Sequence, residues 1–273
     1  MKFTFGIITN NGDLKPVIES IKKQVPQEKY EIIIVGNCDI EPAENIKLIP
    51  FDENIRNIWI TKKKNLITEN ASFENIVFLH DYIILGDDWY SGYEKFGNEW
   101  QVCINPIINL DNTRFRDLII FPFYSELPYG NDAHLAHYTK QDLYTIIPGM
   151  DKFECLIPYD LSEENFNKIR NWQYISGAYW IAKKEVMMKF PLNEDLVWCQ
   201  GEDLDWSERI KKEYIISFNV HSKVHFLKQK DVIFKPFSYN TFNFIYHRIL
   251  TRSKKIFDLQ RSAYTFKAII YVI

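Results

Sequence analysis

The chain has 273 residues, of which 46% are hydrophobic and 25% are charged, a composition that supports a large core and excludes a disordered protein. Its 33 basic and 36 acidic side chains leave a formal charge of −3, which argues against a nucleic-acid partner bound through bulk positive charge. Four scattered cysteines without a C-x-x-C pair argue against a zinc site or a disulfide framework and favour a reducing, cytoplasmic compartment.

Strand and helix patterns alternate along the first part of the chain. Strands are predicted at residues 2–9, 30–35, 47–50 and 76–79. One helix is predicted to follow Asp13, which would cap it, and a second is predicted over 62–71 with Thr61 as its cap. The strands are apolar runs of the kind found in central parallel strands. This alternation predicts an α/β fold with a mostly parallel sheet flanked by helices.

The same alternation continues in the second part. Further strands are predicted at residues 102–104, 118–121, 176–182 and 218–226, and helices over 184–189, 202–211 and from Phe237 onward. Residues 125–166 carry several Pro and Gly residues and indicate either an insertion or a substrate loop. We therefore predict a catalytic domain over residues 1–235 and a C-terminal helical extension over residues 236–273.

The extension combines aromatic and aliphatic side chains with a basic cluster that includes Arg248, Arg252, Lys254 and Lys255. This pattern is typical of a helix lying on an anionic membrane surface, and also of ordinary helices packed against the catalytic domain or a second subunit. We favour the second interpretation, because Phe and Tyr are abundant throughout the chain. No apolar stretch reaches the roughly 18 to 20 residues of a membrane helix. The sequence leaves peripheral membrane contact and a homo-oligomer open.

Two polar motifs stand next to predicted elements in the first part of the chain. His80-Asp81-Tyr82 follows the strand at 76–79, and the carboxyl ends of strands in open parallel sheets are where ligands bind. Asp and His can ligate Mg²⁺ or Mn²⁺, although these side chains can also cap the following turn. Lys62-Lys63-Lys64-Asn65 opens a helix, where the lysines form either a solvated face or a source of charge for a diphosphate.

Two more motifs lie in the second part. A predicted helix begins with three acidic residues, Glu202, Asp203 and Asp205. They either interact favourably with the helix dipole, or one of them serves as a general base. His221 and His225 lie near a strand end, and histidines there are more often packed or hydrogen-bonded than metal-bound.

Taken in order, these motifs resemble those of the GT-A glycosyltransferases, in particular enzymes like family 2. Phe78–Tyr82 with Gly86–Trp89 is similar to the family's acidic motif after its fourth strand. Ser176–Lys184 is similar to its Gly-rich segment, and Gly201–Asp205 to its Glu-Asp motif. The resemblance covers about residues 1 to 230. It implies a Rossmann-like GT-A domain that transfers a sugar from a nucleotide-sugar donor to a hydroxyl acceptor, with inversion.

The resemblance also implies roles for individual residues. Asp203 is the expected general base, with Glu202 as the fallback, and Asp81 and His225 are the expected ligands of a divalent Mn²⁺ or Mg²⁺ ion on the diphosphate. The donor is expected to contact Thr9, Asn37, Lys64, Asn65, His80, Asp81 and Tyr82, and the acceptor to contact Gly177, Ala178 and Trp180. The acceptor would be a glycan, a lipid-linked molecule or a protein.

The sequence departs from the family pattern at two positions. Tyr82 stands where the family has its second, metal-binding Asp, and Gly36 stands where it has a uracil-binding Asp, which leaves Asn37 as the nearest polar side chain.

Two other functions compete with glycosyl transfer. A sugar nucleotidyltransferase should have a Gly-rich phosphate loop after the first strand, but residues 10–13 contain a single glycine, Gly12. A non-catalytic relative that binds a carbohydrate or another subunit would fit the altered acidic motif, whereas the intact pair Glu202-Asp203 argues for catalysis.

Overall fold

The computed structural model describes residues 1–117, 119–120, 155–157, 159–169, 173–198 and 200–230. The chain divides into two compact units, residues 1–120 with 156–232 and residues 121–155 with 233–273. Nearly all described residues belong to the first unit. The predicted extension, residues 236–273, lies outside the described residues, as does most of the Pro- and Gly-containing segment, so the domain boundary stays a prediction.

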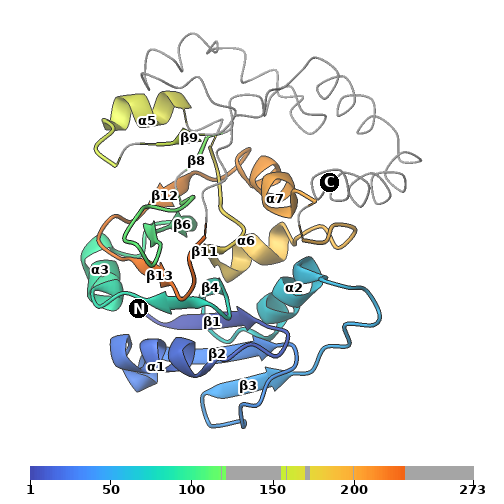
Figure 1. Ribbon diagram of the computed structural model, residues 1–273. Helices are drawn as coiled ribbons and strands as arrows, with labels where there is room; N and C mark the ends of the chain where they lie inside the picture. Colours follow the sequence, from blue (N-terminus) through green and yellow to red (C-terminus); the bar gives the residue numbers. More distant parts are fainter. Residues whose placement is uncertain (118, 121–154, 158, 170–172, 199, 231–273) are drawn as a thin grey trace, which may run out of the picture. The chain divides into compact units, whose positions relative to one another are not determined.

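A seven-stranded sheet with the order β12-β6-β11-β4-β1-β2-β3 forms the centre of the first unit (Figure 1). Its strands are β1 (Phe3–Ile8), β2 (Tyr30–Val35), β3 (Ile46–Ile49), β4 (Asn75–His80), β6 (Val102–Ile104), β11 (Tyr179–Lys183) and β12 (Ile216–Phe218). β1 pairs in parallel with β2 and β4, β2 with β3, and β6 with β12, whereas β11 runs antiparallel between β4 and β6. The predicted α/β fold with a mostly parallel sheet is confirmed.

Helices flank this sheet. The described helices of the chain are α1 (Lys15–Gln24), α2 (Ile60–Asn70), α3 (Trp89–Phe96), α5 (Glu163–Ile169), α6 (Lys184–Lys189) and α7 (Glu202–Ile210), with a 3-10 turn at Gln27–Lys29. Thr61 does not cap α2, because the helix begins at Ile60 and Thr61 is its second residue. The buried Thr61 hydroxyl donates to the Leu196 carbonyl at 2.7 Å. Among the described helices, none combines the length and the apolar character that crossing a bilayer requires.

Alternate residues of β1 face two different layers. Phe3 and Phe5 are fully buried against Trp89 of α3, with ring centroids 4.9 and 5.3 Å away, and burial of each such ring contributes about 2 kcal/mol. On the other face, Gly6 lies against α2, because a Cβ built on it would stand 2.3 Å from Ile67 Cγ2. A glycine here lets α2 approach the sheet closely.

Two small sheets complete the unit. β13 (Val224–Phe226) pairs antiparallel with β5 (Ile83–Leu85) and parallel with β7 (Ile107–Ile108), and the other sheet has the order β10-β8-β9, from Gln173–Tyr174, Ile119–Ile120 and Cys155–Leu156. The single strand predicted at 218–226 is wrong, because a buried turn separates β12 from β13. The Asn219 carboxamide forms this turn by accepting from the His221 amide and donating to the Ser222 hydroxyl, both at 2.9 Å.

Candidate active site

Polar side chains meet where β1 and β4 end. Thr9 directly follows β1 and Asp81 directly follows β4, and the parallel register brings the two strand ends together. The Thr9 hydroxyl donates to Asp81 Oδ2 at 2.7 Å and accepts from the Gly12 amide at 3.0 Å. Thr9 therefore positions the Asp81 carboxylate at the ligand-binding edge of the sheet.

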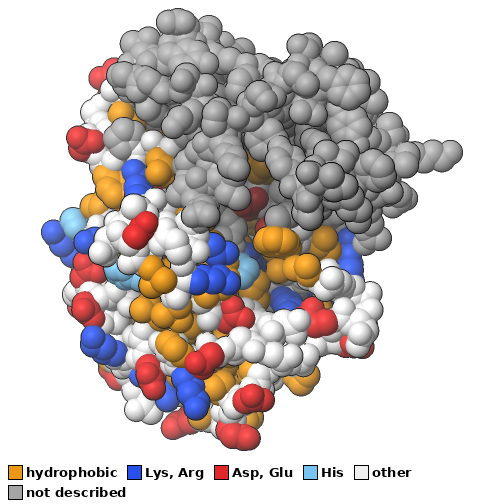
Figure 2. Space-filling view, in the orientation of Figure 1, with side chains coloured by type: hydrophobic (Ala, Val, Ile, Leu, Met, Phe, Trp, Pro, Cys, Tyr) orange, Lys and Arg blue, Asp and Glu red, His pale blue; other side chains and the backbone are white. Residues whose placement is uncertain are grey.

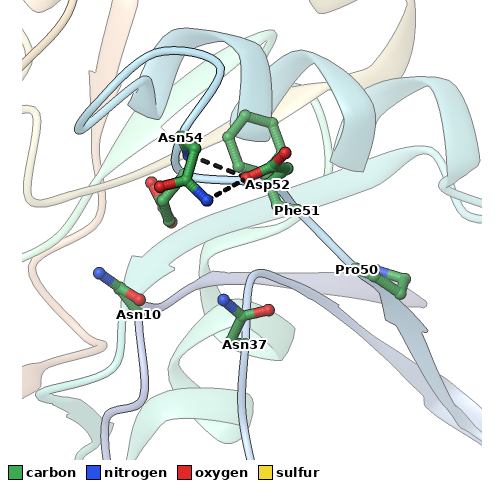
Figure 3. A pocket seen from close by; sticks show the side chains of 7 residues that line it. Asn10, Asn37, Pro50, Phe51, Asp52 and Asn54 are labelled. Atoms are coloured by element: carbon green, nitrogen blue, oxygen red, sulfur yellow. Dashed lines mark hydrogen bonds between the residues drawn. The ribbon is translucent and has the colours of Figure 1, made fainter.

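A pocket of about 500 Å³ opens next to this edge, beyond the ends of β1, β2 and β3. Its lining residues are Asn10, Asn37, Pro50, Phe51, Asp52, Glu53 and Asn54. Figure 3 shows Asn10 and Asn37 facing the segment around Phe51 and Asn54. Asp52 Oδ1 accepts from both the backbone amide and the side-chain amide of Asn54 at 2.9 Å. The volume suits a small organic ligand.

Lys63 of α2 connects this pocket to the strand ends. Its ammonium donates to the Thr9 carbonyl at 2.8 Å, forms an ion pair with Glu53 and lies 5.1 Å from the centre of the Phe51 ring. Gly36, where the family has an Asp, has a φ of +130°, and a Cβ there would stand 2.0 Å from the Thr9 carbonyl oxygen. The backbone at this position therefore admits only glycine.

A second polar cluster forms between α2, the start of β11 and the first turn of α7. The fully buried Lys64 donates to the Gly177 carbonyl at 2.9 Å, and the Gly177 amide donates to Asp203 Oδ2 at 3.0 Å. The Leu204 amide donates to Asp203 Oδ1 at 2.9 Å. A Cβ at Gly177 would lie 3.1 Å from Glu202 Oε1, so the glycine leaves room for both carboxylates.

Burial shifts the pKa values in this cluster, and the neighbouring charges increase or reduce these shifts. Burial lowers the pKa of Lys64 to about 8, against the raising effect of the Glu202 and Asp203 charges. Burial and then the Asp203 charge raise the pKa of Glu202 to about 7, against the effect of Lys64. Glu202 thus titrates near neutral pH beside the hydrogen-bonded Asp203, which is suitable for proton transfer.

His80 joins the two clusters. Burial, followed by the positive charges of Lys64 and Lys230, holds its pKa well below the usual value, and a hydrogen bond with the Gly177 backbone acts in the opposite direction. Its ring stacks on Tyr82 with centroids 5.2 Å apart. Figure 2 shows basic side chains gathered next to a histidine on this face. His80 is therefore a neutral ring held among cations.

The structure does not bring His225 to Asp81. His225 lies on β13 opposite Ile84, and a Cβ on Gly86 would stand 3.3 Å from its Nε2, whereas Asp81 precedes the other end of β5. Within the part of the chain that the structure describes, no group of three or more His, Cys, Asp or Glu side chains is placed to hold a metal ion. The residues around Asp81 therefore do not fit the divalent cation that the resemblance implies.

Two other residues that were predicted to contact the donor or the acceptor make contacts within the protein instead. The Asn65 carboxamide is buried and binds the backbone of Leu192, accepting and donating at 2.9 Å, so it holds a loop and does not line the pocket. Trp180 is fully buried, stacks on Phe78 at 4.8 Å and receives the Lys64 ammonium on its ring at 4.1 Å. Trp180 therefore supports Lys64 and presents no surface to an acceptor, and of the predicted acceptor residues Gly177 is the one that contacts Asp203.

Several residues of the site are missing from the predicted donor and acceptor contacts, although Lys63 belongs to the lysine motif at residues 62–65. They are Asn10, Phe51, Asp52, Glu53, Asn54 and Lys63. The predicted third strand at 47–50 offered a signal, because the residues that follow a parallel strand lie at the same edge as those after its neighbours. The signal for Lys63 was weaker, because a run of three lysines does not indicate which of their side chains points into the protein.

Solved structures resemble the fold of this chain, although no family model and no curated protein sequence matches it. The crystal structure of GalNAc-T7 with UDP, GalNAc and Mn²⁺ matches 85% of this chain with a TM-score of 0.57 and 12% sequence identity. The chain has the GT-A glycosyltransferase fold. It spans 44% of the GalNAc-T7 chain, which is less than half of that protein.

Structures of S. aureus TarS residues 1–349, alone and in complex with UDP, match this GT-A fold less well. Their TM-scores are 0.48 and 0.46, with 14% identity over 82% of this chain and 60% of theirs. The match to GalNAc-T7 confirms the predicted GT-A fold. At sequence identities of 12–14%, these matches show a shared fold and no more.

Proposed function

We propose that this chain is a glycosyltransferase that moves a sugar from a nucleotide-sugar donor to a hydroxyl group of an acceptor. The observation that supports this best is a series of contacts from the pocket to the carboxylates of α7, in which Asp81 and His80 are linked as neighbours in the chain. In order, the series contains Glu53, Lys63, Thr9, Asp81, His80, Gly177 and Asp203. A donor with its nucleoside in the pocket would have its diphosphate near Asp81 and its sugar toward Asp203.

The pocket is suited to a nucleoside. Phe51 supplies a ring face, and the carboxamides of Asn10 and Asn37 can both donate and accept hydrogen bonds. The match in fold to GalNAc-T7, which was crystallised with UDP, supports a nucleotide as ligand. Gly36 removes the acidic side chain that would select uracil in the family, so the donors tested below carry four different bases.

The transfer needs a base and a leaving group. As the acceptor oxygen attacks the anomeric carbon, the bond from that carbon to the diphosphate oxygen breaks, and its electron pair leaves with the nucleoside diphosphate. Asp203 accepts the hydroxyl proton, and its two backbone hydrogen bonds orient its carboxylate for this step. A single displacement inverts the anomeric carbon. Glu202, whose pKa burial raises to about 7, is the alternative base.

A divalent cation supplies positive charge to a diphosphate in metal-dependent transfer. Mn²⁺ is present in the GalNAc-T7 structure, and the use of Mn²⁺ or Mg²⁺ by this chain stays a prediction. The residues around Asp81 do not form a ligand set for such an ion, and no step proposed above depends on one. The glycan, lipid-linked or protein acceptor, the homo-oligomer, the membrane contact and the cytoplasmic location also stay predictions.

The test is release of nucleoside diphosphate from a panel of UDP-, GDP-, CDP- and dTDP-sugars. We expect one nucleotide class to be consumed by the intact protein and not by the Asp203→Asn variant. Binding of a donor without release by the intact protein would favour the non-catalytic relative. A product in which a nucleotide is joined to a sugar phosphate would favour the nucleotidyltransferase. Neither binding nor release with any donor would overturn the proposal.

A further inference from the structure

The four residues after β13, Leu227–Lys230, are fixed against the strand ends by backbone hydrogen bonds. The Leu227 amide donates to the Tyr82 carbonyl at 2.8 Å, which continues the pairing of β13 with β5 up to the acidic motif. The Lys230 amide donates to Asn109 Oδ1 at 3.0 Å. This segment therefore has a defined position next to Tyr82.

A side-chain contact holds the middle of this segment. The Gln229 carboxamide donates to Asp111 Oδ2 at 2.9 Å and accepts from the Asp111 amide at 3.3 Å. Leu227 and Lys228 lie in a bend after β13, and the ammonium groups of Lys228 and Lys230 both contact the Tyr82 ring.

Both ammonium groups lie on the Tyr82 side chain. The Lys228 ammonium is 3.9 Å and the Lys230 ammonium 4.4 Å from the centre of the ring, and the latter is 3.3 Å from the Tyr82 hydroxyl. Each contact is a cation–π interaction, which orients the lysine side chain. Tyr82 thus holds two positive charges next to Asp81.

The position of Tyr82 indicates which ligand the two lysines would meet. Tyr82 replaces the carboxylate that would bind a metal ion in the family, and in its place the fold presents two cations from the segment after β13. A nucleotide-sugar carries one negative charge on each of its two phosphates, and lysine binds phosphate as a point charge. A divalent ion, by contrast, would be repelled by ammonium groups at this distance.

We propose that Lys228 and Lys230 bind and neutralise the diphosphate of the donor beside Asp81, in the role that a divalent cation fills in metal-dependent transfer. This inference rests on the proposed function. When the bond to the anomeric carbon breaks, the charge that develops on the leaving oxygen would be stabilised by these ammonium groups.

The experiment compares a nucleoside diphosphate with its nucleoside, using UDP with uridine, GDP with guanosine, CDP with cytidine and dTDP with thymidine. Binding to the full chain is measured by calorimetry in EDTA and again with Mn²⁺. We expect the intact protein to bind one diphosphate in EDTA. Lys228→Ala and Lys230→Ala should each weaken that binding about 10- to 100-fold, as expected for a lost hydrogen bond to a charged group, and leave nucleoside binding unchanged.

Three control variants sharpen the comparison. Lys228→Arg and Lys230→Arg keep the charge and should keep most of the affinity for the diphosphate. Lys223→Ala removes an exposed lysine just before β13 and should change neither affinity. Circular dichroism of every variant checks that the fold is retained.

The outcomes separate this inference from the proposed function. If the intact protein binds none of the diphosphates, both are overturned. If a diphosphate binds only with Mn²⁺, or binds the alanine variants as tightly as the intact protein, the lysine role is overturned while the proposed function stands. Equal losses for a diphosphate and its nucleoside would also overturn the lysine role, because the lysines would then act on the pocket and not on the phosphates.

Discussion

The Thr9 hydroxyl donates a hydrogen bond of 2.7 Å to the Asp81 carboxylate and thereby links the carboxyl ends of β1 and β4. Gly12 encloses the same carboxylate from another side, because a Cβ at Gly12 would stand only 2.2 Å from Asp81 Oδ2. The position of the Asp81 carboxylate is therefore set by the Thr9 hydroxyl and by the close approach of the Gly12 backbone.

Gly12→Ala should displace Asp81 and lower turnover by about 10²-fold, the cost expected for a misplacement of about 1 Å at a catalytic centre. Thr9→Val should act on the same carboxylate by removing its hydrogen-bond donor. Because the two changes affect one group, we expect the double variant to lose much less than the product of the single losses. Steady-state kinetics of the three variants test this. Normal turnover in Gly12→Ala would show that the position of Asp81 is unimportant.

Phe51→Ala should weaken the binding of a nucleoside and of its diphosphate by the same factor. Stacking of a base on an aromatic side chain is worth about 1–3 kcal/mol, which corresponds to about 5- to 150-fold in affinity. The matched control is Phe73→Ala, whose ring also lies beside a lysine, 5.2 Å from the Lys2 ammonium, but near the amino end of β1. Unchanged calorimetric affinities in Phe51→Ala would mean that the base does not use this ring.

Much of the fold could be predicted because buried parallel strands are apolar runs that end at turn residues. Residues 30–35 and 184–189 were predicted with the bounds that the structure has. The direction of β11 could not be predicted, because an apolar run such as 179–183 fits a parallel or an antiparallel neighbour equally well. The split of β12 from β13 depends on the buried carboxamide of Asn219, whose hydrogen bonds in the turn no periodicity reveals.

The site could be predicted only in part. Asp81 closely follows a predicted strand, so its position in the chain indicated the ligand-binding edge of the sheet. Gly177 and Asp203 lie inside a predicted strand and a predicted helix, and the resemblance to the Gly-rich and Glu-Asp motifs indicated their roles. Lys228 and Lys230 were missed, because their place beside the acidic motif follows from the pairing of β13 with β5, a contact between distant segments. Asn65 was predicted to meet the donor, but tertiary packing turns its carboxamide to the Leu192 loop.

Asp203→Asn should lower turnover by about 10² to 10⁴-fold, the usual loss when acid–base catalysis is removed, with little change in donor affinity. The substitution keeps the shape of the side chain and its hydrogen bond from Gly177, and removes its basicity. Asp205→Asn is the matched control, because Asp205 lies on the same helix but forms an ion pair with Arg209. If Asp203→Asn retains near-normal turnover, Asp203 is not the base, and Glu202→Gln becomes the variant to measure.

The buried pair Lys64 and Glu202 should make stability depend on pH in two opposite ways. The pKa of Glu202 is raised from 4.5 to about 7 in the folded protein, so its contribution to stability is complete below pH 4.5 and is lost as the pH rises through 7. The pKa of Lys64 is lowered from 10.5 to about 8, so the unfolded chain binds more protons between these values, and stability recovers as the pH rises across them.

The contribution of this pair to the free energy of unfolding should therefore be smallest between about pH 7 and 8, where both side chains are charged while buried. Urea unfolding of the intact protein and of two variants, measured from pH 5 to 10, isolates that contribution. Relative to the intact protein, Glu202→Gln should gain stability as the pH rises from 5 to 7.5, because its amide cannot ionise. Lys64→Met should lose its relative advantage as the pH rises from 8 to 10, because the intact protein then buries a neutral amine. Parallel stability curves for the intact protein and Glu202→Gln below pH 7.5 would show that Glu202 ionises at its usual pKa and that the cluster does not hold a proton near neutral pH.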